Sequence, residues 1–252
     1  MSNFHLSNLS AVVLAGGFGT RVRKLLGSLP KPLAIVHNRP FIYWLISYLL
    51  KQQIHHIFYL THYEAFKIEN YVKEYEKFFK TSSCIVEDMP LGTGGGLIKI
   101  INEQTVKTDF ILLINGDSLT PFDLTKTCEL FDQGADAIIV AVKVKDTSRF
   151  GSIKKGVNDK LEEFNEKKEG EGLVNAGMYI FKSNLLKKYL HLKNTLSLEL
   201  DLIPKLISDD IDIRVIESDE PFIDIGTENS LFSASFFIDN LIKNNSITEF
   251  DK

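Results

Sequence analysis

The sequence has few cysteines, no long run of one charge and no long apolar run. Its 252 residues include 2 cysteines, Cys84 and Cys128, which form no C-x-x-C pair. This argues against a disulfide framework or a cysteine zinc site and fits a reducing compartment. No stretch of about 18 apolar residues could span a membrane, and residues 1–10 lack the pattern of a signal peptide. We therefore expect a cytoplasmic protein with no membrane partner.

The chain also has no excess of positive charge: it contains 29 Lys and Arg and 33 Asp and Glu, which gives a formal net charge of −4. Without a basic run, the chain has no electrostatic footprint for a nucleic acid. Any phosphate that it binds must be met by a few well-placed cations. The composition, 44% hydrophobic and 25% charged, is close to the globular average and predicts a well-buried core.

Short apolar runs alternate with segments of helical spacing in the first half of the chain, which predicts a sheet wrapped by helices. The expected strands are 11–15, 57–61, 83–87 and 110–114, and the expected helices are 41–52, 65–79 and one starting at 97. The second half predicts a strand at 137–144, a hairpin at 152–164, strands at 178–181 and 212–216, and a helix at 230–243.

These elements favour an α/β protein with a three-layer, Rossmann-like arrangement, a predominantly parallel mixed sheet and a small inserted β part that binds substrate. We read one domain at 11–245, preceded by an extension at 1–10 and followed by a tail at 246–252. Its halves are 11–135, which would bind nucleotide, and 136–228, which would bind the second substrate.

A glycine-rich segment follows the first predicted strand. Glycines let backbone N–H groups approach a phosphate closely, and a helix beginning near Thr20 would add its positive end. Arg21 and Lys31 add two positive charges suited to phosphate. The segment is neither a Walker A loop nor a dinucleotide fingerprint, so a tight turn without ligand is the alternative. The residues expected to contact nucleotide here are Leu14, Ala15, Gly16, Gly17, Gly19 and Thr20.

The run G-G-x-G-T-R followed by P-K-P-L resembles the signature of the sugar-phosphate nucleotidyltransferases. The resemblance extends from residue 11 to about residue 240 and includes later motifs in the same order. It implies that the glycine loop wraps a nucleoside triphosphate. It also implies that Arg21 and Lys31 are catalytic, because they neutralise the phosphates.

Glu87 and the segment Pro90-Leu91-Gly92-Thr93 resemble the E-x-x-P-L-G-T-[AG]-G pattern of guanylyltransferases. In that family the segment lies over the nucleobase. A carboxylate at Glu87 could accept both guanine donors, N1–H and the 2-amino group, as a fork. GTP is therefore the favoured nucleotide. The alternative for Glu87 is a solvated charge at the end of a strand.

Asn115-Gly116-Asp117 follows an apolar strand, and strand ends in α/β sheets are where ligands and metals gather. The resemblance implies that Gly116 contacts the nucleotide, and that Asp117 is catalytic and holds Mg²⁺ together with Asp224. Two carboxylates that each follow an apolar run suit a hard cation shared with phosphate oxygens. The alternative for Asp117 is a helix cap.

Three later segments resemble the family's sugar-binding motifs: Gly151 in R-[YF]-G, Glu166 and Lys167 in F-x-E-K, and Asn175 in N-[AT]-G-[IV]-Y. The resemblance implies that Glu166 and Asn175 bind sugar hydroxyls and that the catalytic Lys167 holds the sugar phosphate. Lys168 stands where the family usually has Pro, and a solvated charge run is the alternative. For Glu199 and Asp201, helix capping and surface charge are the favoured interpretation.

The expected reaction condenses a nucleoside triphosphate with a sugar 1-phosphate and releases pyrophosphate, for a surface glycan such as capsule, lipopolysaccharide or S-layer glycan. The pattern most resembles the D-glycero-α-D-manno-heptose 1-phosphate guanylyltransferases. Alternatives are a mannose-1-phosphate guanylyltransferase, a glucose-1-phosphate thymidylyl- or uridylyltransferase, a glycosyltransferase, and a non-catalytic nucleotide-binding regulator. The resemblance also allows a homodimer.

Overall fold

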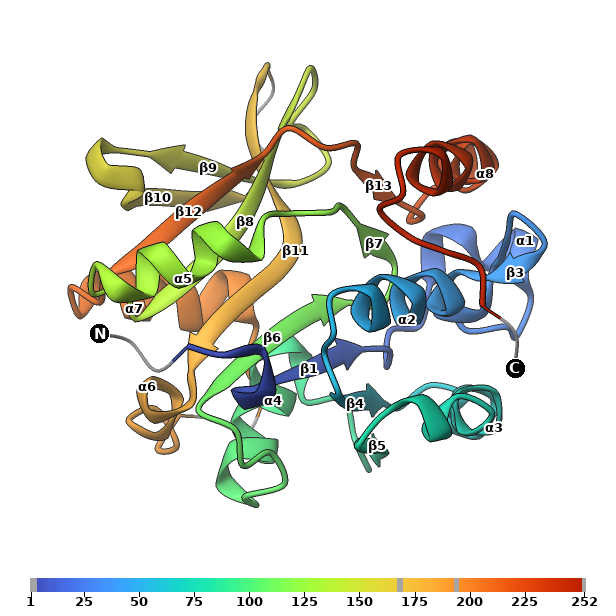
Figure 1. Ribbon diagram of the computed structural model, residues 1–252, viewed down its shortest axis with the longest axis horizontal. Helices are drawn as coiled ribbons and strands as arrows, with labels where there is room; N and C mark the ends of the chain where they lie inside the picture. The colour runs from blue at the N-terminus through green and yellow to red at the C-terminus, as the bar shows by residue number, and fades with distance from the viewer. Residues whose placement is uncertain (1–3, 167–169, 193–194, 251–252) are drawn as a thin grey trace. The chain divides into compact units, whose positions relative to one another are not determined.

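A computed structural model describes residues 4–166, 170–192 and 195–250 (Figure 1). The chain forms two compact units, each assembled from separate stretches of sequence. Unit 1 contains residues 1–9, 91–113 and 122–220, and unit 2 contains residues 10–90, 114–121 and 221–252. None of the helices in the described residues combines the length and the apolar character needed to cross a bilayer.

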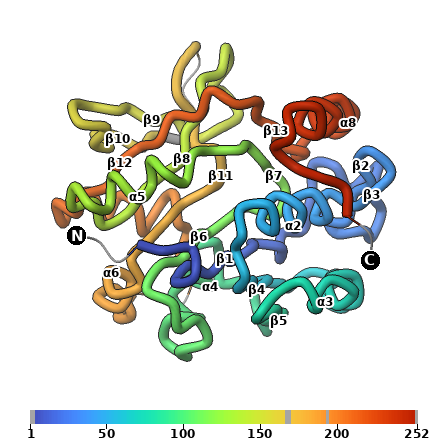
Figure 2. The backbone as a smooth tube through the Cα atoms, in the orientation of Figure 1, coloured from blue at the N-terminus to red at the C-terminus, as the bar shows by residue number. Residues whose placement is uncertain are grey.

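Unit 2 contains three parallel strands, which Figure 2 shows in their order along the chain: β1 (Leu9–Leu14), β4 (His56–Thr61) and β5 (Thr81–Val86). Ser10 pairs with His56, and His56 pairs with Thr81. The strands expected at 11–15, 57–61 and 83–87 are thereby confirmed to within two residues at each end. Their parallel pairing follows from the helices that separate them in sequence.

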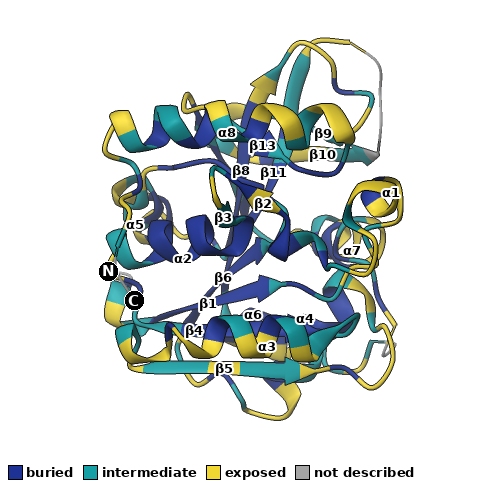
Figure 3. Ribbon diagram, turned by 90° about the vertical axis from the view of Figure 1, so that its right-hand side faces the viewer, coloured by how far each residue is buried: buried dark blue, intermediate teal, exposed yellow. Residues whose placement is uncertain are grey.

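The helix α2 (Phe41–Lys51) connects β1 to β4 and is buried on nearly every side, as the dark blue ribbon in Figure 3 shows. A helix that is apolar all round belongs in a core. Its one indole, Trp44, donates from Nε1 to the carbonyl of Val36 at 3.0 Å, so this buried donor is satisfied. The helix α3 (Ala65–Lys73) connects β4 to β5 and buries only Ile68 and Val72.

The closing helix α8 (Glu228–Lys243) begins two residues before the predicted start, at a capping box formed by Thr227 and Ser230. The other elements of unit 2 are short. They are η2 (Thr20–Val22), α1 (Arg23–Leu26), η3 (Lys31–Leu33), β2 (Ile35–Val36), β3 (Arg39–Pro40), η4 (Glu76–Phe78), β7 (Ser118–Leu119) and β13 (Ile223–Asp224).

The segment after α8 is held against α2 by backbone and ring contacts. Phe250 donates its N–H to the Tyr43 hydroxyl at 2.8 Å and accepts that hydroxyl's proton at 3.1 Å. The two rings stack with centroids 4.8 Å apart. Thr248 makes the same reciprocal pair with Ser47, at 3.0 and 2.5 Å. The end of the described chain therefore covers part of the core of unit 2.

We expect Phe250→Ala to lower the free energy of unfolding by about 2 kcal/mol, because it removes the ring that stacks on Tyr43. Chemical denaturation of the whole protein measures the change. Phe236→Ala is the matched control, since that ring is 70% exposed on α8 and its loss should cost less than about 0.5 kcal/mol. Equal effects of the two substitutions would contradict this account of the C-terminal segment.

Unit 1 is built around β8 (Ala137–Val144), which pairs antiparallel with β11 (Gly172–Lys182) and parallel with β12 (Ile213–Ser218). A hairpin of β9 (Gly151–Lys155) and β10 (Leu161–Glu166) joins β11 through β9. The predicted hairpin and both later strands are thus confirmed, although β11 begins six residues before the strand expected at 178–181. The antiparallel pairs occur because only five residues separate β9 from β10, and β10 from β11, which is too few for the crossover that a parallel pair needs.

The helix expected from residue 97 begins earlier, because α4 spans Gly92–Asn102. Glycine is a poor helix former, but the carbonyl of Leu196 accepts the N–H groups of Gly94 and Gly95 at 2.9 and 3.0 Å. This contact satisfies donors that the first turn would otherwise leave free. The remaining elements are η1 (Leu6–Asn8), β6 (Phe110–Asn115), α5 (Leu124–Asp132), η5 (Val157–Asp159), α6 (Ser183–Lys187), η6 (Leu198–Leu202) and α7 (Ile203–Ser208).

Candidate functional site

The glycine loop of unit 2 follows β1 and packs against the end of β4. Ala15 donates its N–H to the carbonyl of Leu60 at 2.7 Å, and a Cβ on Gly16 would lie 3.2 Å from the Cβ of His62. The helix expected near Thr20 is one 3₁₀ turn followed by a four-residue helix, so few peptide dipoles are aligned there. Attraction for an anion would therefore come mainly from loop N–H groups and from Arg21, which is exposed.

Lys31 and Asp117 form an ion pair in unit 2, although 86 positions separate them in the chain. The Lys31 ammonium donates to Oδ2 of Asp117, and the two side chains are only 19% and 25% exposed. The Lys31 stem lies against Gly19 of the glycine loop. The structure thus brings together one residue predicted to bind phosphate and one predicted to hold a metal.

Asp224 lies on the strand that pairs with the segment of Asp117. In the antiparallel pair of β7 and β13, Asp224 is opposite Ser118. The N–H of Ile225 donates to the carbonyl of Asp117 at 2.9 Å. Directly opposed residues in such a pair have Cα atoms about 4.5–5.5 Å apart. Asp117 precedes Ser118 in the chain, so the two predicted metal ligands have neighbouring backbone positions although they are 107 residues apart in sequence.

The donor set of this pair suits a magnesium ion that also binds substrate. Among residues 4–166, 170–192 and 195–250, no group of three or more His, Cys, Asp and Glu could hold a metal by itself. Mg²⁺ commonly takes one or two carboxylates and completes its shell with water and phosphate oxygens. Asp117 and Asp224 fit that pattern, because both supply hard oxygen donors: Asp224 lies on β13, and Asp117 directly precedes the paired strand β7.

Gly116 lies directly against β1. Its N–H donates to the carbonyl of Leu14 at 2.9 Å, and a Cβ at this position would lie 2.6 Å from that carbonyl oxygen. Real Cβ atoms essentially never come so close, so any side chain would push the backbone of Asp117 away from Leu14.

We expect Gly116→Ala to lower the free energy of unfolding by about 2 kcal/mol through this overlap. Gly17→Ala is the matched control, because no atom lies within 4 Å of a Cβ built there. The control should change stability by less than about 0.5 kcal/mol, while weakening triphosphate binding if Gly17 faces the phosphates. Denaturation curves for both variants decide the point, and a larger loss for Gly17→Ala would contradict it.

Glu87 is buried at the end of β5, with 9% of its surface exposed. Its N–H donates to the carbonyl of Thr61 at 2.8 Å, and its own carbonyl lies 2.8 Å from Nδ1 of His62. A solvated surface charge therefore does not describe this residue. Its backbone is fixed on both sides, as a residue that reads a nucleobase edge requires. Pro90, three residues on, is exposed.

In unit 1, Leu91, Gly92 and Thr93 form the start of α4, and the carbonyl of Leu91 accepts the N–H of Leu196 at 2.8 Å. The predicted nucleobase segment is therefore the N-terminal turn of a helix rather than a loop. The backbone of Leu91, Gly92 and Thr93 is therefore held in one conformation.

Three of the residues predicted to bind the sugar, Gly151, Glu166 and Asn175, lie on β9, β10 and β11 of unit 1. Gly151 pairs with Glu166 in the hairpin, and Asn175 lies where the register of β11 against β8 shifts. Bulges of this kind re-aim side chains and occur beside functional sites. Oδ1 of Asn175 accepts the N–H of Gly177 at 2.9 Å, which fixes the amide. Lys167 lies outside the described residues.

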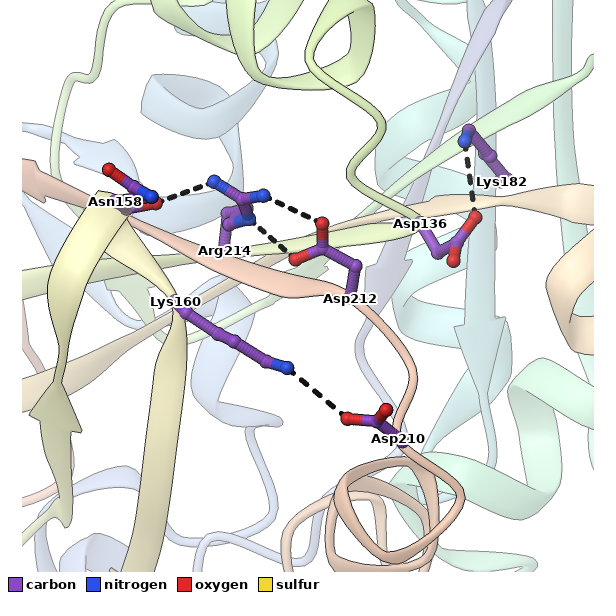
Figure 4. A network of polar contacts seen from close by, with 7 residues as sticks. All are labelled: Asp136, Asn158, Lys160, Lys182, Asp210, Asp212 and Arg214. Carbon is purple, nitrogen blue, oxygen red and sulfur yellow. Dashed lines mark hydrogen bonds and ion pairs between the residues drawn. The ribbon is translucent and has the colours of Figure 1, made fainter.

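The two carboxylates of the late D-x-D segment of unit 1, Asp210 and Asp212, are paired with basic side chains (Figure 4). Asp212 accepts two hydrogen bonds from Arg214, at 2.5 and 2.7 Å, and these lower the pKa of its carboxyl. Asp210 meets the ammonium of Lys160 at 3.2 Å. Both carboxylates are therefore held in ion pairs, Asp212 within its own segment and Asp210 with a lysine next to β10.

Two further side chains contact the predicted site residues, although the sequence assigned neither of them to the site: His62 was not singled out, and Glu199 was interpreted as a helix cap or surface charge. His62 holds the carbonyl of Glu87, and Glu199 accepts the hydroxyl proton of Thr93 at 3.0 Å. The local sequence does not reveal either contact, because the partners are 25 and 106 positions apart.

The chain belongs to the nucleotidyl transferase family, whose model matches residues 10–240. It is 33% identical to the D-glycero-alpha-D-manno-heptose 1-phosphate guanylyltransferase of Aneurinibacillus thermoaerophilus, over 86% of this chain and 93% of that protein. It is 30% identical to the mannose-1-phosphate guanylyltransferase of Mycobacterium tuberculosis, over 80% of this chain but only 56% of that protein.

Among solved structures, the crystal structure of HddC from Yersinia pseudotuberculosis superposes with a TM-score of 0.79 and 29% identity. The match covers 91% of this chain and 99% of HddC, and HddC complexed with GMP-PN gives a TM-score of 0.77. The predicted α/β nucleotidyltransferase fold, with its mixed sheet, is thereby confirmed.

Proposed function

We propose that this chain is a sugar-1-phosphate guanylyltransferase, which joins GTP to a sugar 1-phosphate and releases pyrophosphate. The observation that carries the proposal is the arrangement in unit 2. There the Lys31–Asp117 pair lies against the glycine loop, with Asp224 on the neighbouring strand. Family membership and the HddC complex with GMP-PN support a nucleotide at this site.

In the proposed reaction an oxygen of the sugar 1-phosphate attacks the α-phosphorus of the triphosphate. The bond between that phosphorus and the bridging oxygen to the β-phosphate breaks, and pyrophosphate leaves with the electron pair. The nucleophile is already an anion, so the step needs no strong base. The main barrier is repulsion, about 4 kcal/mol for two unit charges at 4 Å and an effective dielectric of 20. Catalysis is then mostly positioning and charge neutralisation.

The residues of unit 2 divide this task. The glycine loop and Arg21 hold the β- and γ-phosphates, and Lys31 reaches the α-phosphate. Asp117 and Asp224 would hold Mg²⁺, and the bound ion would supply positive charge that offsets the negative charge of the phosphates. Glu87 accepts the two guanine donors, consistent with its burial and fixed backbone.

The sugar phosphate is assigned to unit 1, with Asn175 and Glu166 binding hydroxyls, the Gly151 backbone touching the sugar, and Lys167 holding the phosphate. Similarity to heptose 1-phosphate guanylyltransferases and to HddC favours D-glycero-α-D-manno-heptose 1-phosphate as the substrate. A mannose or glucose 1-phosphate is the alternative within this reaction class.

A glycosyltransferase is a poorer explanation of the same residues. Such enzymes carry a D-x-D motif after a strand, whereas here Asp117 is followed by Ser118 and Leu119. The D-x-D segment at Asp210 comes late, before β12 rather than after a strand. A regulator without catalysis would not need Arg21, Lys31, Asp117 and Asp224 together.

The test is a matrix of four triphosphates against heptose, mannose and glucose 1-phosphates, with Mg²⁺ and with EDTA, read by pyrophosphate release. We expect release with GTP and one sugar phosphate, and none with EDTA. Release of pyrophosphate from no pair would contradict the proposed function. Release with a triphosphate other than GTP would contradict only the role given to Glu87, and the class of reaction would stand.

A further inference from the structure

Glu199 lies at the centre of a hydroxyl cluster in unit 1. Its Oε1 accepts the hydroxyl proton of Tyr179 at 3.0 Å. Its Oε2 accepts those of Thr93 at 3.0 Å and Ser197 at 3.2 Å. Glu199 belongs to η6, a single π-helical turn, and such turns often mark functional sites. A surface charge or a helix cap does not describe a carboxylate that gathers three donors from three segments.

One oxygen of Glu199 is anchored by the start of α4. The Thr93 hydroxyl, which donates to Oε2, also accepts the N–H of Leu198 at 2.9 Å. The chain passes so close that a Cβ on Gly92 would lie 2.5 Å from the carbonyl oxygen of Leu196. The segment before Glu199 is therefore docked on α4, and the direction of the carboxylate is fixed.

The other oxygen of Glu199 orients Tyr179, which in turn orients Asn175. The Tyr179 hydroxyl donates to Glu199 and accepts from Nδ2 of Asn175. Burial raises the pKa of Tyr179 well above the ordinary tyrosine value, and the neighbouring Glu199 carboxylate raises it further. The hydroxyl therefore keeps its proton. It can donate one hydrogen bond, to Glu199, and accept one, from Asn175.

Fixing Asn175 in this way decides what its amide can offer to a ligand. Oδ1 accepts the N–H of Gly177 at 2.9 Å, and Nδ2 donates one of its two protons to Tyr179. The amide keeps one N–H and one oxygen lone pair. A sugar hydroxyl, which both donates and accepts, matches such a pair of groups.

We propose that Glu199 is a positioning residue for the sugar: it holds the Tyr179 hydroxyl so that the Asn175 amide presents a fixed donor and acceptor to a sugar hydroxyl. The inference rests on the proposed function and adds a residue to it. Glu199 touches neither substrate in this account and acts through two hydrogen bonds in series.

Glu199→Gln is the direct test, because it keeps the shape of the side chain but replaces one acceptor oxygen by an NH₂ donor. Facing three hydroxyl donors, the amide cannot accept from both sides. We expect the KM for the sugar 1-phosphate to rise about tenfold, as for the loss of one oriented hydrogen bond. The KM for GTP should change less than about twofold, and Tyr179→Phe should behave alike.

Asp201→Asn is the matched control. Asp201 lies in the same π-helical turn, where its carboxylate accepts the N–H of Ser197 at 2.7 Å, but it does not meet Tyr179. If Glu199 matters only for the stability of this turn, the two variants should shift both KM values and the thermal midpoint together. That outcome would overturn the proposal.

A double-mutant cycle tests the route of the effect. Asn175→Ala should raise the sugar-phosphate KM by itself, and adding Glu199→Gln should raise it no further, because Glu199 acts only through Asn175. Additive effects, or an unchanged KM in Asn175→Ala, would overturn the inference. A wild-type protein that releases no pyrophosphate would instead contradict the proposed function, so the two failures are distinct.

Discussion

Asp117→Asn should lower kcat by about a thousandfold or more and leave the fold intact. The substitution keeps the shape of the side chain but removes the negative charge that, in the proposed function, holds Mg²⁺ on the phosphates. Loss of one electrostatic group that stabilises developing charge costs about 10²–10³ in rate. A lost metal ligand should cost at least as much. Steady-state kinetics with saturating GTP and sugar 1-phosphate measure the change.

Two further variants make this result specific. Asp224→Asn should also lower kcat, since Asp224 lies on the strand paired with the Asp117 segment. Asp239→Asn, at a half-exposed carboxylate on α8 of the same unit that lies 3.5 Å from the His37 ring, should leave kcat within about twofold. Full activity in Asp117→Asn would remove the metal assignment, whereas equal losses in all three variants would indicate damage to the fold.

Lys31→Met should lower kcat by about a hundredfold, because it removes the cation assigned to the α-phosphate while keeping the length of the stem. The same variant should bind Mn²⁺ more tightly in the absence of nucleotide, by about tenfold. The reason is that Lys31 neutralises Asp117 in the structure and so competes with a metal for that carboxylate. Kinetics and calorimetric titration with Mn²⁺ alone give the two readings.

Lys73→Met is the control for Lys31, since Lys73 is an exposed lysine on α3 of the same unit. It should change neither kcat nor Mn²⁺ affinity measurably. If Lys31→Met bound Mn²⁺ no better than the wild type, the ion pair would not compete with the metal. The dual role of Lys31 would then be wrong, even if kcat fell.

The elements around the candidate site that the sequence placed correctly are those that follow from strand periodicity. The apolar run at 11–15 predicted β1. The glycine loop that follows it had to lie at the carboxyl end of a sheet strand, where ligands bind in α/β sheets. The same reasoning placed Asp117 and Asp224 at the ends of apolar runs. The structure adds that their segments are hydrogen-bonded neighbours.

The parts that the sequence did not predict depend on contacts between distant positions. Local propensity places no helix in Gly92–Gly96, and the helix exists because the carbonyl of Leu196 satisfies its first donors. Glu199 looked like one acid in a charged segment, since its partner Thr93 is 106 positions away. The pairing of Lys31 with Asp117 across 86 positions was unmarked for the same reason.

The fate of the α-phosphate of GTP tests the central claim most directly. The protein is incubated with Mg²⁺, the preferred sugar 1-phosphate and GTP labelled at the α-phosphorus, and the products are separated. We expect the label to move into the nucleotide sugar and the pyrophosphate to be unlabelled. Label recovered as free GMP or GDP, with no nucleotide sugar formed, would contradict it.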